Sequence, residues 1–115
     1  MIRLTLLASL FASAASAQLV APVLPSDAAP PAPLAPGVIG KPAGTGAWPA
    51  VAESVAEARG YTLYHPAKMP AQKLPLILWG NGGCRDNGLA ASRFLREVAS
   101  HGYFIVANGA PRFER

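Results

Sequence analysis

One stretch of the sequence decides the fold: Leu74-Pro75-Leu76-Ile77-Leu78-Trp79-Gly80-Asn81-Gly82-Gly83-Cys84. An apolar run ends there abruptly in small and turn-forming residues. After a segment of helical pattern, a second apolar run covers residues 103–107. The order strand, glycine-rich loop, helix, strand is how an α/β protein builds a site at the carboxyl end of a parallel strand. We therefore predict an α/β fold with its functional site at this loop.

Three segments predict β-strands. Residues 76–79 are apolar without alternation, which favours a strand that is covered on both faces in the interior of a parallel sheet. Residues 61–65 are aromatic and β-branched, and Pro66 ends them, so they predict the strand before it. Residues 103–107 predict the strand that follows the helix, and Asn108-Gly109-Ala110-Pro111 ends it.

The segment between the two apolar runs predicts an amphipathic helix. Its apolar residues fall at i, i+3, i+4 and i+7, which places them on one helix face: Ala91, Phe94, Leu95 and Val98. Gly102 suits the position after the helix end, where a left-handed conformation is common. His101 lies in the last turn, and we interpret it as a cap and not as a general base.

The first 17 residues have the organisation of a secretory signal peptide. Arg3 supplies the positive charge, residues 4–12 form an apolar core, and Ala15-Ser16-Ala17 is a small-x-small cleavage site. The apolar core is shorter than the roughly 20 residues that a membrane-spanning helix needs. We therefore expect export to the periplasm or the medium, with no membrane association after cleavage.

Residues 18–47 predict an extended, unfolded linker. They hold seven of the 12 prolines of the protein, and their only charges are Asp27 and Lys41. Proline fixes φ and has no N–H to donate, which opposes regular structure. Residues 48–115 are then the folded part. Within it, residues 50–59 combine good helix formers with an alternation that also fits an edge strand, so both readings stay open.

Composition and motif spacing exclude several functions. The net charge of +4 comes without any run of Lys or Arg, so we expect no nucleic-acid partner. Arg85 stands where a dinucleotide fingerprint needs its third glycine, and Leu89 stands where a P-loop needs its lysine. We expect no cofactor and no metal.

Cys84 does not fit a catalytic nucleophile. A nucleophile elbow has the pattern Gly-x-[Ser/Cys]-x-Gly, and Asp86 stands where the second glycine must be. Cys84 is the single cysteine of the chain. In an oxidising compartment, an odd cysteine suggests a disulfide with a partner elsewhere.

The glycine loop fits an oxyanion hole best, because such a site needs backbone N–H donors that are fixed before the negative oxygen develops. Two blocks make this interpretation more specific: Trp79-Gly80-Asn81-Gly82-Gly83, and Ala99-Ser100-His101-Gly102-Tyr103 leading into the last apolar strand. With these blocks, residues 46–111 resemble the N-terminal part of a secreted α/β-hydrolase. The branch they resemble is that of the dienelactone hydrolases and the cutinase-like polyester hydrolases.

The resemblance implies an incomplete α/β-hydrolase sheet (strand–strand–helix–strand) in residues 48–115. It implies that Asn81 donates one oxyanion N–H, with Gly82 as the second choice, and that the substrate is a small-molecule or polymeric ester. The catalytic serine of the family lies in a later Gly-x-Ser-x-Gly elbow, followed by an acid and a histidine. The 115 residues contain no such elbow.

We therefore expect a fragment of a secreted serine ester hydrolase, truncated before the nucleophile elbow and inactive alone. A sheet built from these elements would have one bare face and unpaired edges. The alternative function is a non-catalytic exported module that binds a partner and is presented on the proline-rich tether. That alternative requires the chain to fold by itself.

Overall fold

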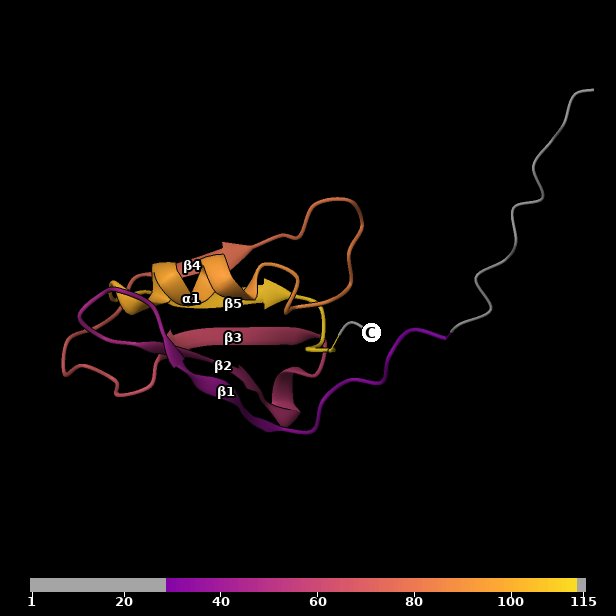
Figure 1. Ribbon diagram of the computed structural model, residues 1–115, viewed down its shortest axis with the longest axis horizontal. Helices are drawn as coiled ribbons and strands as arrows, with labels where there is room; N and C mark the ends of the chain where they lie inside the picture. The colour runs from indigo at the N-terminus through magenta and orange to yellow at the C-terminus, as the bar shows by residue number, and fades with distance from the viewer. Residues whose placement is uncertain (1–28, 114–115) are drawn as a thin grey trace, which may run out of the picture.

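Strands from both halves of the folded region form one mixed sheet, and a helix packs on one face of it (Figure 1). The computed structural model describes residues 29–113. Within them the strand order is β1-β2-β3-β5-β4, in which β4 and β5 are parallel and the other neighbours antiparallel. The elements are β1 (Gly37–Ala43), β2 (Ala50–Ser54), η1 (Ala56–Ala58), β3 (Tyr61–Pro66), β4 (Leu76–Trp79), α1 (Ser92–Ser100) and β5 (Phe104–Asn108).

The prediction of an unfolded linker through residue 47 is wrong for residues 37–43. They form β1, which pairs with β2 so that Ile39 lies opposite Ala52 and is buried in the core. Pro42 has no N–H to donate. It is tolerated because β1 is an edge strand of the described sheet, and its pairing with β2 is irregular between Ile39 and Ala43. The predicted signal peptide and residues 18–28 of the linker lie outside the described residues.

Residues 50–59, for which the sequence allowed either a helix or a strand, contain a strand and a short helical turn. Residues 50–54 form β2, and a single 3-10 turn follows at residues 56–58. Ala50 and Ala52 are fully buried in the core. Tertiary burial therefore overrides the helix propensity of these residues, as is usual for strands.

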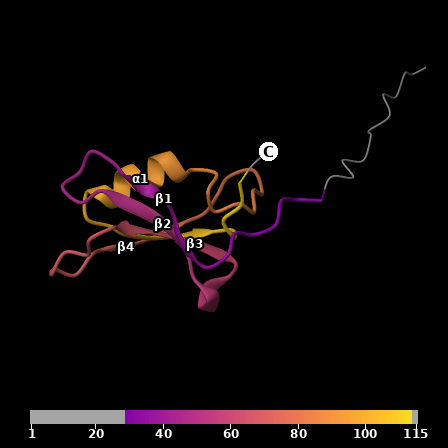
Figure 2. The ribbon, with the colours of Figure 1, turned by 60° about the horizontal axis from the view of Figure 1, so that its bottom comes forward.

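The predictions for β3, β5 and α1 are confirmed. Helix α1 lies on one side of the sheet (Figure 2), where its buried Leu95 and Ala99 belong to the same core cluster as Tyr64 and Ile105. Gly102 has φ +97°, and its N–H donates to the Ala99 carbonyl at 3.0 Å. It therefore ends the helix as predicted, because a left-handed residue after the last turn satisfies a free carbonyl.

The prediction for β4 is confirmed in its direction and wrong in its position. β4 is parallel to β5, but within residues 29–113 it is the last strand of the sheet. Ile77 and Trp79 pack against the core, whereas the alternate residues Leu76 and Leu78 are 62 % and 76 % exposed. The expected bare face and open edge are thus present in the described residues. β4 also carries none of the charged residues that usually protect an edge strand.

Two leucines of opposite environment test this arrangement in the full chain. Leu95→Ala removes a side chain that is 1 % exposed and should lower the free energy of unfolding by about 2–5 kcal/mol. Leu78→Ala, the matched control on the bare face, should change it by less than about 0.5 kcal/mol. Urea unfolding followed by circular dichroism measures both. Equal losses would show that Leu78 is covered.

Candidate functional site

The side chain of Asn81 ties the carboxyl ends of β4 and β5 together. Its Nδ2 donates to the carbonyl oxygen of Asn108 at 2.9 Å and to that of Asn87 at 3.0 Å. Its Oδ1 accepts the indole N–H of Trp79 at 2.9 Å. Both amide hydrogens and the amide oxygen of Asn81 are therefore used inside the protein. Figure 1 shows the loop after β4 and the end of β5 at the same end of the sheet.

The backbone N–H of Asn81 is also used internally. It donates to Oδ1 of Asn108 at 2.6 Å. Asn81 thus does not supply the free oxyanion donor that the sequence led us to expect. The reason is geometric: parallel strands end at the same edge of a sheet, so Asn108 at the end of β5 reaches the first residues after β4.

The next three residues form the exposed tip of the loop. The N–H of Arg85 donates to the carbonyl of Gly82 at 3.4 Å. Gly83 and Cys84, at the two central positions of this turn, have φ of +65° and +55°, as in a type I′ turn. Among residues 29–113, the N–H groups of Gly82, Gly83 and Cys84 have no acceptor. Gly82, the second choice from the sequence, therefore carries a free donor directly after the fixed residue Asn81.

The other end of the loop is fixed at Asn87 and Gly88. Oδ1 of Asn87 accepts the N–H of Leu89 at 3.0 Å and that of Arg112 at 3.1 Å. The N–H of Gly88 donates to the Ala110 carbonyl at 3.1 Å. A side chain at Gly88 would collide with the hydroxyl of Thr62. Both ends of the loop are thus held, and the amides of Gly82, Gly83 and Cys84 between them are free.

Tyr64 supports this end of the loop from inside the core. Its hydroxyl donates to the Gly88 carbonyl at 2.6 Å. Burial raises the pKa of Tyr64 above its usual value, against smaller opposing effects of Ser92 and Arg96. The hydroxyl therefore stays protonated and acts as a donor.

The sequence analysis missed the roles of Asn87 and Asn108. The available signal was the dipeptide Asn-Gly, which occurs at residues 81–82, 87–88 and 108–109. In each pair the asparagine side chain makes a hydrogen bond at the rim and a glycine follows. Asn-Gly is a familiar turn signal, but its use as a clamp depends on tertiary contacts.

Neither histidine lies at the loop. Nε2 of His65 is 2.7 Å from a Glu53 carboxylate oxygen, and its ring stacks on Phe104, the first residue of β5. His101 precedes β5 and pairs with Glu97 at 3.0 Å. Both therefore lie toward the start of β5, whereas the glycine loop lies at its end. This agrees with our interpretation that His101 is not a general base for this site.

Glu97 connects α1 to the segment between β1 and β2. Its carboxylate accepts the N–H of Thr45 at 2.9 Å and also accepts the Thr45 hydroxyl. The pKa of Glu97 is lowered to about 2, first by the Thr45 hydroxyl and then by His101. This contact is structural and lies away from the glycine loop.

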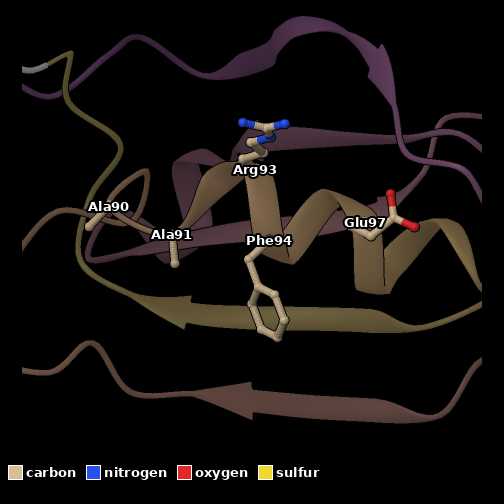
Figure 3. A pocket seen from close by; sticks show the side chains of 5 residues that line it. All are labelled: Ala90, Ala91, Arg93, Phe94 and Glu97. Carbon is tan, nitrogen blue, oxygen red and sulfur yellow. The ribbon is translucent and has the colours of Figure 1, made fainter.

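Outside the glycine loop, the described residues include a hollow on α1. This hollow of about 580 Å³ lies beside Phe94 on α1, where the side chain of Arg93 points away from the phenyl ring (Figure 3). Residues 29–113 contain no group of three acidic, histidine or cysteine side chains suited to a metal. In the same residues no helix has the length and apolar character to cross a membrane. Cys84 is an exposed free thiol.

Comparison of the chain with protein-family models, with curated proteins and with solved structures gave no match.

The asparagine clamp predicts different results for two Asn→Asp substitutions. Asn81→Asp replaces an NH₂ group that serves two carbonyl oxygens with a charged acceptor, and should lower the free energy of unfolding by about 1–3 kcal/mol. Asn108→Asp keeps the oxygen that accepts the Asn81 N–H, and should cost less than about 1 kcal/mol. Chemical unfolding of the full chain at pH 7 measures both. A larger loss for Asn108→Asp would refute the clamp.

The lowered pKa of Glu97 predicts a loss of stability in acid. Because the folded pKa of about 2 lies below the usual carboxyl pKa of 4.5, the stabilisation is complete above about pH 4.5 and disappears as the pH falls toward 2. Glu97→Gln should remove this part of the pH dependence, so the two proteins should converge in stability at low pH. Thermal melts between about pH 2 and pH 7 measure this difference. Parallel profiles would contradict the prediction.

Proposed function

We propose that the chain is the oxyanion-hole half of an exported serine ester hydrolase of α/β-hydrolase type, with Gly82 as the residue whose N–H stabilises the oxyanion. Ester hydrolysis passes through a tetrahedral intermediate whose negative oxygen needs donors that are already in place. The proposal assigns the attacking serine, the acid and the histidine to polypeptide other than these 115 residues.

The observation that carries the proposal is the free N–H of Gly82 at the carboxyl end of the parallel pair β4 and β5. The α/β-hydrolases take one oxyanion donor from a loop that joins a strand to the first helix of the sheet. Here the glycine loop joins β4 to α1, the first α-helix of the described residues. Its asparagine anchors hold the main chain, so the donor needs no reorganisation when the charge develops.

The serines of the described residues support the assignment of the nucleophile elsewhere. Ser54 is buried in β2. Ser100 donates to the Glu97 carbonyl at 2.6 Å and accepts the N–H of Gly46 at 3.0 Å. Ser92 is the first residue of α1. None of the three stands on a tight turn between glycines, where a nucleophilic serine of this fold is exposed.

The exposed apolar face fits the same proposal. A parallel strand such as β4 is normally covered on both faces, yet Leu76 and Leu78 are exposed here. Further strands and helices of a complete hydrolase domain would cover them. Export is supported by the signal-peptide pattern of residues 1–17.

A pair of substitutions at Gly82 tests the donor in the complete hydrolase, with a p-nitrophenyl ester as substrate. Gly82→Pro removes the N–H and should lower kcat by about 10²–10³-fold with little change in KM. Gly82→Ala is the matched control, because a Cβ there meets no atom within 4 Å and the N–H remains. It should keep kcat within about threefold, well under the effect of one lost donor.

Equal activity of the Gly82→Pro protein and the parent would remove Gly82 from the site. Thermal melts of both variants guard against a loss that comes from misfolding. We expect the two variants to melt at similar temperatures, and only Gly82→Ala to hydrolyse the ester at a rate close to that of the parent.

The alternative, a non-catalytic exported module, is favoured by one observation: residues 29–113 have a buried core of their own, which contains Tyr64, Leu95 and Ile105. A cooperative melt of the 115-residue chain, together with the absence of p-nitrophenyl ester hydrolysis by the parent protein, would support this second function.

A further inference from the structure

We propose that a second site, the groove between β1, the start of α1 and the residues after β5, binds a carboxylate ligand with an apolar body. The groove has a volume of about 390 Å³. Two arginines line it, Arg96 and Arg112, together with apolar side chains from three different segments: Ile39, Leu89 and Phe113. It shares only Asn87 with the glycine loop, and the proposal does not depend on ester hydrolysis.

Arg96 holds a partly buried charge that has no acidic partner among the described residues. Its Nη2 donates to the Ile39 carbonyl at 2.6 Å. The guanidinium lies against the backbone of Gly40, where a Cβ would come within 3.0 Å of Nη2. Its Nε is buried and finds no acceptor in residues 29–113. A charge removed from water in this way favours an anion beside it.

Arg112 adds a second cation to the lining of the groove. Its Nη1 donates to the carbonyl of Pro31 at 2.6 Å. Its backbone N–H and carbonyl are both bonded to the side chain of Asn87, at 3.1 and 3.0 Å. The main chain that carries this guanidinium is therefore fixed. Like Arg96, it bonds a neutral carbonyl and leaves further N–H donors of its planar group for a ligand.

The lining of the groove selects the ligand. No acidic residue lines it, and the ion pairs found within residues 29–113 both join a histidine to a glutamate. The planar fork of a guanidinium matches a carboxylate with two parallel hydrogen bonds. Phe113, which is 62 % exposed, and the partly buried Leu89 offer apolar surface for the rest of the molecule. A fatty or aromatic monocarboxylate meets both requirements.

Hexanoate is the probe, and the full chain is titrated with it while ¹H–¹⁵N NMR spectra are recorded. We expect saturable shifts that include the Arg96 Nε–H signal. Arg96→Gln and Arg112→Gln should each weaken binding by about tenfold or more, the effect of losing one charge-assisted pair. Arg93→Gln is the matched control, because Arg93 is an arginine of the same helix that does not line the groove, and it should bind as the parent does.

Two further ligands separate the explanations. Hexan-1-ol has the same apolar body without the charge and should not saturate. Inorganic phosphate has the charge without the apolar body and should bind more weakly than hexanoate. Equal binding of hexanoate and hexan-1-ol, an equal loss in Arg93→Gln, or no saturable shift would each overturn the proposal. If the Arg96→Gln protein unfolds, the binding measured for Arg112→Gln tests the proposal instead. The Arg112 side chain bonds only the segment before β1, so its loss should leave the fold intact.

Discussion

The carboxyl end of the sheet depends on one side-chain amide, that of Asn81. It bonds main-chain carbonyls on both sides, at the end of β5 and at the return of the loop, and its own N–H is taken by Asn108. Backbone groups that leave a sheet must find partners elsewhere. Here a neighbouring strand end provides them, so the chain leaves β4 in a fixed direction.

The function proposed for the following glycines depends on this fixation. A loop of free amides that moved would lose much of its electrostatic effect, because catalytic stabilisation requires donors that are already oriented. In this protein the held residues are Asn81 and Asn87, and the free amides lie between them at Gly82, Gly83 and Cys84. The arrangement separates the anchor from the donor by a single peptide bond.

The sequence predicted those elements whose signal is local. The apolar runs located β3, β4 and β5, and the helical spacing around Leu95 located α1. It did not locate β1, because the seven prolines in residues 18–47 predicted an unfolded linker over a region that includes this short strand. It also led us to expect a free N–H at Asn81, which is bonded, because the acceptor for this N–H lies 27 residues further along the chain. Partners at such separation are set by tertiary structure, which residue spacing alone does not encode.

Amide hydrogen exchange of the full chain, followed by NMR, tests the central claim most directly. A hydrogen-bonded amide exchanges only when the structure opens, whereas a free one exchanges near its intrinsic rate. We predict strong protection of the Asn81 N–H and almost none for Gly82 and Gly83. Protection of Gly82 equal to that of Asn81, or fast exchange at Asn81, would contradict the claim that a clamped asparagine presents free glycine donors.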